Sequence, residues 1–184
     1  DNLYNIICSH AGRPAAFWLE NDEVKSADFT SLAEMADNWA SALSSIFGTE
    51  GRVAISLDSC KEWFPLFWGL VRSGHDILLL DVSATDEKTE AIMNECGCSR
   101  IVCGRKRSLP ESIEQVCIDR LKDSPSVNGY VPVWGHDIAL CTSGTASDSK
   151  IFVYDEETIC EIALFSKKVY MSNRLLIDDY GFRT

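Results

Sequence analysis

A chain of 184 residues is long enough for one domain with a sizeable hydrophobic core. Apolar residues make up 46% of it and charged residues 24%, as in ordinary globular proteins, and no apolar run approaches the ~20 residues of a membrane-spanning helix. The formal net charge of -11 argues against nucleic acid and anionic lipid as partners, because contacts with phosphates require a surplus of lysine and arginine.

The first 30 residues predict a short helix that ends near Gly12, followed by a β-hairpin. The hairpin strands are the apolar stretches 15–19 and 24–29, separated by the polar turn 20–23. The next helix is predicted from a capping box, in which Ser31 and Glu34 each satisfy one unpaired N–H of the first turn. Apolar residues then recur at steps of three and four until Gly48, which is typical of a helix with one buried face.

Residues 31–104 predict an α/β fold, a parallel sheet of βαβ units flanked by helices. After the first helix, short apolar runs at 52–57, 77–80 and 100–103 are expected to be strands. A helix capped by Asp58 or Ser59 and ending at Gly74 connects the first two strands, and a helix over 85–95 connects the second pair.

Residues 105–136 are expected to be a weakly structured connection, with helical character over 110–121 and a loop over 124–129. Residues 137–184 begin with a strand over 137–141, continue through a polar loop and a short strand over 151–154, and end with a helix that Asp155 caps. We expect 1–184 to form a single unit without internal repeats.

The eight cysteines do not form a recognisable disulfide or zinc pattern. They include no Cys-x-x-Cys pair and no histidine at ligand spacing, so reduced cysteines and a cytoplasmic location are expected. His10, His75 and His136 lie far apart in the sequence, and no catalytic role is expected for them. The basic cluster of Arg100 and residues 105–107 is interpreted as a solvated loop rather than a binding patch.

The segment 142–150, Thr-Ser-Gly-Thr-Ala-Ser-Asp-Ser-Lys, carries the clearest chemical signal. A turn of small residues after a strand can aim several backbone N–H groups at one point, while hydroxyls and a lysine add donors, as a polyphosphate requires. A surface turn rich in serine and threonine explains the same composition, and composition alone leaves both interpretations open. The P-loop of nucleoside triphosphatases is excluded, because Ser149 precedes Lys150 and Ile151 follows it.

This segment resembles the phosphate-binding signature of the adenylate-forming superfamily, which includes acyl-CoA synthetases, luciferases and peptide-synthetase adenylation domains. Thr142 to Thr145 match its Thr-Ser-Gly-Thr, and Lys150 falls at its lysine position. The resemblance extends, with gaps, over about residues 12–170. Further matches are Phe29-Thr30, Gly51-Arg52-Val53-Ala54-Ile55, Ser59 to Trp63, Gly69 to Gly74, and Leu80-Asp81.

The resemblance implies the N-terminal subdomain of an acyl-CoA synthetase-like ligase. Such enzymes join a carboxylate to ATP with Mg²⁺, release pyrophosphate, and usually transfer the acyl group to a thiol such as coenzyme A. It further implies that the loop holds the β- and γ-phosphates and that Thr145 lies near the magnesium ion. The implied ATP-binding residues are Thr142, Ser143, Gly144, Thr145, Ala146, Ser147 and Lys150. No catalytic residue is expected within the 184 residues, since the family's other functional segments follow much later in its sequence.

Departures from the family pattern leave a second interpretation open. Ser147, Ser149 and Ile151 replace a glycine, a proline and a glycine of the signature, so a stiffer or differently shaped loop is expected. The chain is then either part of a ligase that binds a small carboxylic acid, or a non-catalytic α/β module, as a split or degenerate subunit that needs a second chain. In both cases uncovered apolar surface is expected to favour self-association. A flavodoxin-like domain is a third interpretation, which the strand order can test.

Overall fold

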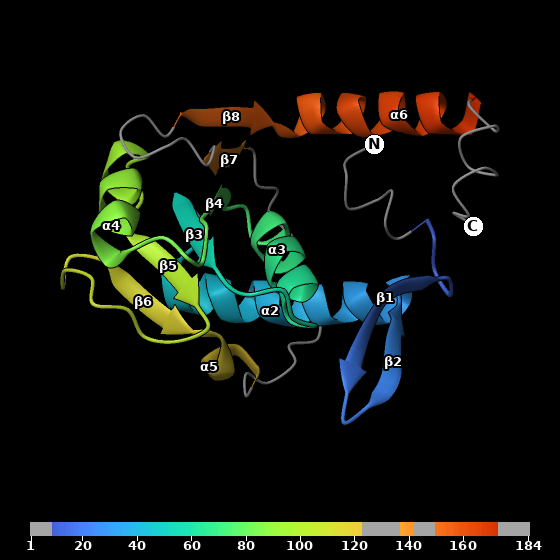
Figure 1. Cartoon of the computed structure of the whole chain (residues 1–184), viewed down its shortest axis with the longest axis horizontal. Coiled ribbons are helices and arrows are strands. Elements are labelled where there is room, and N and C mark those ends of the chain that lie inside the picture. The colour runs from blue at the N-terminus through green and yellow to red at the C-terminus, as the bar shows by residue number, and fades with distance from the viewer. Residues whose placement is uncertain (1–8, 123–136, 142–149, 173–184) are drawn as a thin grey trace.

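The computed structural model describes residues 9–122, 137–141 and 150–172. Its centre is a six-stranded sheet with helices on both faces, and a two-stranded hairpin stands apart from it (Figure 1). The predicted helix before Gly12 falls mostly on residues 1–8, outside the described residues, and residues 9–12 form turns.

The hairpin consists of β1 (Pro14–Glu20) and β2 (Glu23–Asp28), as the sequence predicts. Its two-residue turn places Asn21 at φ 52° and Asp22 at φ 61°. Positive φ at both central residues matches the right-handed twist of the flanking strands, and asparagine and aspartate tolerate it better than most residues.

Helix α2 (Phe29–Phe47) begins earlier than its predicted capping box. Its N-cap is Asp28, whose Oδ1 accepts a hydrogen bond of 2.7 Å from the backbone N–H of Ser31. The predicted cap at Ser31 is therefore wrong, because the carboxylate three residues upstream already satisfies that N–H group. The helix ends at Gly48 as expected, where φ is 79°.

The predicted parallel sheet is confirmed. It has five parallel strands, one of which, over residues 114–117, was not predicted as a strand, and a sixth strand that is antiparallel. The elements after α2 are β3 (Arg52–Ser56), α3 (Trp63–Arg72), β4 (Asp76–Leu79), α4 (Asp86–Glu95), β5 (Arg100–Cys103), β6 (Glu114–Cys117), α5 (Ile118–Lys122), β7 (Asp137–Cys141), β8 (Ile151–Asp155) and α6 (Glu156–Ser172). The strand order is β6-β5-β3-β4-β7-β8. A flavodoxin-like sheet has its fifth strand beyond the fourth, whereas β7 lies beside β4, the second parallel strand, so that interpretation is wrong.

Two helix predictions are wrong in their bounds, and one predicted helix cap is confirmed. Helix α3 starts at Trp63 rather than at Asp58 or Ser59, and its N-cap residue Glu62 makes no side-chain capping bond. The helical character predicted for 110–121 is limited to the short α5, because residues 114–117 pair with the open edge of β5 instead. At the start of α6, Asp155 Oδ1 accepts the Thr158 N–H at 2.7 Å, which confirms the predicted cap.

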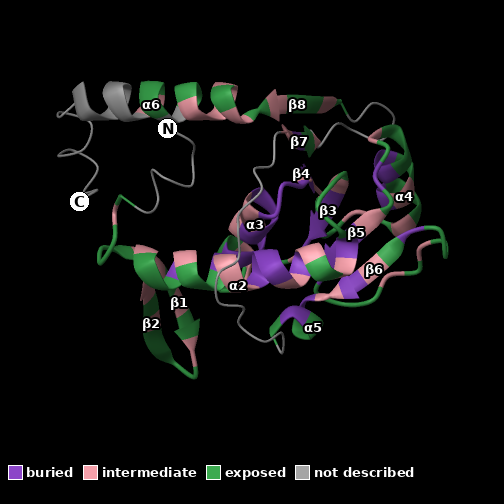
Figure 2. Ribbon diagram, turned by 180° about the vertical axis from the view of Figure 1, so that it is seen from behind, coloured by how far each residue is buried: buried purple, intermediate pink, exposed green. Residues whose placement is uncertain are grey.

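Each face of the sheet has its own hydrophobic core. On one face, α2, α3 and α5 pack against strand residues such as Val53 and Val102, and on the other, α4 packs against Ala54 and Ile101. In Figure 2 the buried residues gather in α2, α3 and the central strands, while the hairpin and β8 are half-buried or exposed. Within the described residues, no helix is both long and apolar enough to cross a bilayer.

Gly69 permits the close approach of α3 to α2. A Cβ atom at this position would lie 3.1 Å from Trp39 Cβ and 3.3 Å from both the Ala36 carbonyl oxygen and the Ala40 nitrogen. We expect Gly69→Val to lower the free energy of unfolding by about 1–3 kcal/mol, because two of these neighbours are backbone atoms that cannot rotate away. Urea unfolding measures this, with Ala91→Val on the exposed side of α4 as the matched control. Valine has a higher helix propensity than glycine but a lower one than alanine, so propensity alone would stabilise Gly69→Val slightly and destabilise only the control. An unchanged or higher stability of Gly69→Val would therefore contradict the crowding.

Candidate functional site

The loop singled out by the sequence leaves and re-enters the sheet at one edge. Strands β7 and β8 are antiparallel, and Cys141 is the register partner of Ile151, so both ends of the connection 142–150 lie side by side. Strand β7 is parallel to β4, which places Cys141 at the edge where the carboxyl ends of the parallel strands lie. In open α/β sheets, ligands bind outside this edge.

Of the predicted ATP-binding residues, only Lys150 belongs to the described part of the chain. It is exposed and immediately precedes β8. The others lie outside the described residues, and their roles stay predictions: Thr142, Ser143, Gly144, Thr145, Ala146 and Ser147. The same holds for Thr145 as a magnesium ligand. Among the described residues, no three or more histidine, cysteine or acidic side chains are grouped closely enough to hold a metal ion.

The replacement of the family's glycine by Ile151 does not strain the backbone. Ile151 is a half-buried strand residue that pairs with Cys141 and packs against the core under α4. Among the described residues other than glycine, only Asn21 and Asp22 have positive φ. A glycine is therefore not required where β8 begins, and the expected stiffening can concern only Ser147 and Ser149.

A cavity of about 470 Å³ opens at the same edge of the sheet. It lies at the ends of β3 and β5 and beside the segment that follows β4. Its lining residues are Ser56, Asp58, Val82, Ser83, Cys103, Gly104, Arg105 and Arg107. A second cavity, of about 480 Å³, shares the two arginines and reaches the start of α4 at Thr85 and Asp86. The edge thus offers hydroxyl, carboxylate and guanidinium groups to a polar ligand.

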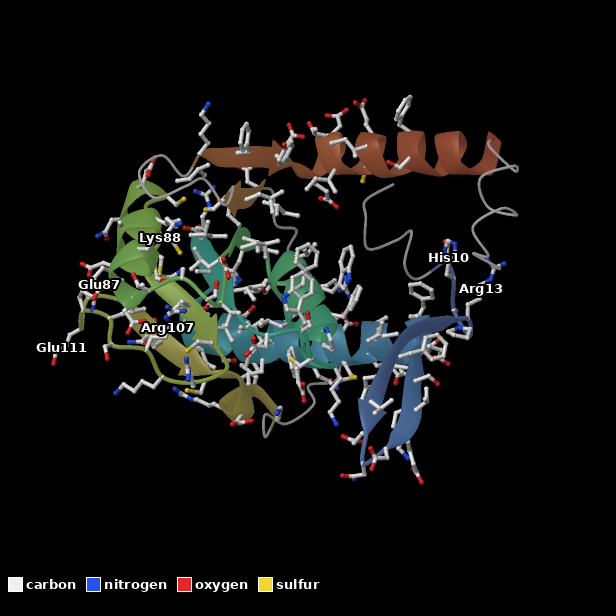
Figure 3. All side chains as sticks on the ribbon, in the orientation of Figure 1. His10, Arg13, Glu87, Lys88, Arg107 and Glu111 are labelled. Atoms are coloured by element: carbon white, nitrogen blue, oxygen red, sulfur yellow. The ribbon has the colours of Figure 1, made fainter. Side chains whose placement is uncertain are left out.

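Arg107 organises this edge and is not the solvated residue that the sequence suggests. Its side chain is only 10% exposed and lies among α4, β5 and β6 (Figure 3). Its Nε donates to Asp86 Oδ1 at 2.8 Å, its Nη1 to Ser56 Oγ at 2.9 Å, and its Nη2 to the Ala84 carbonyl oxygen. The Ser108 N–H, at 2.9 Å from Asp86 Oδ2, and then Arg107 lower the pKa of that carboxyl group.

The sequence did not predict Asp86 and Arg107 as site residues, because they are 21 residues apart and form no motif. No periodicity or spacing links them, and only the return of the chain past α4 brings them together. Asp81, in contrast, belongs to the Leu-Asp pair of the resemblance. Its Oδ1 accepts hydrogen bonds from the Ser83 hydroxyl at 2.7 Å and from the Ser83 N–H at 2.9 Å. These two bonds lower the pKa of Asp81 and shape the turn after β4.

Comparison with known sequences decides which family this arrangement belongs to. A sequence model described as "AMP-binding enzyme" matches residues 8–156, a range that contains the whole loop and both strands that flank it. The chain belongs to the AMP-binding enzyme family. The suspected resemblance is thereby confirmed at the level of the family, while no curated protein matches the chain.

Several solved structures share the fold at low sequence identity. The N-terminal subdomain of NpsA from Klebsiella oxytoca matches with a TM-score of 0.69 and 18% identity over 83% of this chain and 41% of that one. A fatty acyl CoA synthetase from Mycobacterium tuberculosis matches at 0.66 and 17%, over 85% and 35% of the chains. McyG A-PCP, complexed with phenylalanyl-adenylate, matches at 0.74 and 16%, over 92% and 30%. The chain thus has the fold of an N-terminal subdomain and spans 30–41% of these three proteins.

Proposed function

We propose that this chain is the N-terminal part of an AMP-forming acyl-acid ligase. The enzyme would activate a small carboxylic acid with ATP and then form a thioester with coenzyme A or a carrier thiol. The observation that carries the proposal is the position of the loop 142–150, which lies within the family match and whose flanking strands end and begin at the carboxyl edge of the sheet.

In this proposal the loop binds the phosphates of ATP and the carboxylate attacks the α-phosphorus in line. The loop's backbone N–H groups and hydroxyls would hold the β- and γ-phosphates, and Lys150 would pair with a phosphate oxygen. The donor set suits a polyphosphate, because hydroxyls and one lysine follow a strand whose end lies at the sheet edge. Mg²⁺, held near Thr145, would neutralise phosphate charge. The chain's own residues thus position ATP, and positioning supplies much of the rate enhancement in such reactions.

Exposed apolar side chains indicate where the remainder of the ligase would pack. Strand β8 forms one edge of the sheet, and α6 continues from it beyond the sheet (Figure 1). The exposed residues of these two elements include Val153 at 52% and Phe165 at 68%, with Phe152, Ile162 and Leu164 alongside. Apolar surface of this kind marks an interface. We propose that the remainder covers it, as part of one longer chain or as a separate subunit, and that the 184 residues alone self-associate.

The test is ATP–pyrophosphate exchange with a panel of carboxylic acids. The purified 184 residues should give no exchange, whereas co-expression with the remainder of the ligase should yield a complex that exchanges pyrophosphate with at least one acid. The remainder of the ligase expressed without the 184 residues is the matched control and should give no turnover. Turnover by the 184 residues alone would contradict the proposal that they need the remainder.

A degenerate, non-catalytic relative is the second candidate, favoured by Ser147 and Ser149 in place of the signature's glycine and proline. It predicts that the complex assembles but exchanges no pyrophosphate with any acid. The location proposed for either candidate is the cytoplasm, where thiols such as the seven described free cysteines stay reduced.

A further inference from the structure

Two cysteines lie opposite each other on neighbouring strands, at the carboxyl ends of β5 and β6. Cys103 ends β5, Cys117 ends β6, and the two are direct register partners in a parallel ladder. Neighbouring strands lie about 4.8 Å apart, within the range of about 4.4–6.8 Å that joins Cα atoms across a disulfide. Register partners also direct their side chains to the same face of the sheet. The backbone therefore already has the spacing that a disulfide requires.

The two thiols differ in exposure, although both are free. Cys103 is buried in the sheet and borders the cavity of about 470 Å³, whereas Cys117 is half-buried on the edge strand β6. The Sγ of Cys103 lies 3.7 Å from the carbonyl oxygen of Val116, the residue directly before Cys117. Burial, and then the neighbouring Cys117 thiol, raise the pKa of Cys103 to about 11. Cys117 is thus the residue that a reagent in solution reaches first.

We propose that Cys103 and Cys117 form a redox-sensitive dithiol, which a low-molecular-weight disulfide such as oxidised glutathione converts into a disulfide between β5 and β6. The Cys117 thiolate attacks the glutathione disulfide, and one glutathione thiolate leaves. Cys103 then loses its proton and attacks the Cys117 sulfur of the mixed disulfide, which releases the second glutathione. Two protein thiols are oxidised while one glutathione disulfide is reduced to two thiols.

Closure of this bond would affect the candidate site. The disulfide joins the two ends of the segment 104–116, which carries Arg105 and Arg107 along both cavities. It would also tie β6 covalently to β5, its one neighbouring strand among the residues that the structure describes. Oxidation would thereby restrict the segment that forms one wall of the carboxyl edge, and the exchange reaction is reversible by reduced glutathione.

The experiment equilibrates the folded 184-residue chain in glutathione buffers of increasing oxidised fraction and traps remaining thiols with N-ethylmaleimide. Trypsin cleaves after Arg100, Arg105, Arg107 and Arg120, so Cys103 and Cys117 fall on the separate peptides 101–105 and 108–120. Mass spectrometry should find these two peptides linked, at the sum of their masses less two hydrogens, with a matching loss of alkylation at both cysteines.

Single variants separate the two exchange steps. Cys103→Ser should retain glutathione on Cys117, because no second thiol resolves the mixed disulfide, and Cys60→Ser, which alters an exposed cysteine elsewhere, should close the bond as the wild type does. Protein unfolded in guanidinium is the geometric control and should lose the preference for this pair. Full alkylation of both cysteines at the highest oxidised fraction, or equal linkage of Cys117 to several cysteines in the folded protein, would overturn the proposal.

Discussion

In the complete enzyme, Lys150→Ala should raise the ATP concentration required for half-maximal pyrophosphate exchange by about 10- to 100-fold. The expectation follows from the proposed pairing of Lys150 with a phosphate oxygen, since a hydrogen bond between charged groups contributes about 1.5–3 kcal/mol and each 1.4 kcal/mol is about tenfold in affinity. Lys150 is exposed just before β8, so its replacement should leave folding largely unchanged.

The matched control is Lys25→Ala in the hairpin, which removes a lysine that pairs with Glu23 far from the loop in sequence. This variant should retain the ATP dependence of the wild type. The conservative change Lys150→Arg should recover part of the lost affinity, because it keeps the charge with a different geometry. An unchanged ATP requirement in Lys150→Ala would refute the assigned role of the lysine and leave the fold assignment intact.

The second large effect concerns His75 and the stability of the domain in acid. The side chain is 1% exposed between α3 and β4, its Nδ1 lies 2.6 Å from Ser73 Oγ, and its Nε2 has no hydrogen-bond partner among the described residues. Burial, and then the positive charge of Arg100, lower the pKa of His75 to about 4 from the model-peptide value of 6.5. The folded protein therefore holds this imidazole neutral.

A histidine whose pKa is lower in the folded state binds its proton more readily in the unfolded chain. Its contribution to stability is present above about pH 6.5 and is lost as the pH falls toward 4, where the loss reaches about 3 kcal/mol. Urea unfolding between pH 7.5 and 4 should show this loss in the wild type. His75→Phe, which cannot titrate, should show a shallower pH dependence, although carboxyl groups still contribute. Equal slopes for the two proteins would rule out the buried neutral histidine.

Local sequence signals predicted most elements of the fold correctly. Periodicity located α2, and the polar turn at Asn21 and Asp22 located the hairpin, because these patterns depend on residues a few positions apart. The boundary of α2 was less predictable, since Asp28 and Ser31 are both good caps and only the path of the chain out of β2 decided between them. Segment 114–117 was assigned wrongly because its conformation depends on the unpaired edge of β5 rather than on its own residues.

The sequence by itself determined the α/β class, the parallel strands other than β6 and the family signature between Thr142 and Lys150, because each depends on residues that lie close together in the sequence. Only the tertiary structure decided which side chains meet. The strand order places Cys103 beside Cys117, and the return of the chain past α4 brings Arg107 into contact with Asp86. The antiparallel pairing of β8 with β7 places both ends of the loop at the carboxyl edge of the sheet. The physical reason is that hydrophobic period and capping act within a few residues, whereas pairing across a sheet depends on which strand edge remains open.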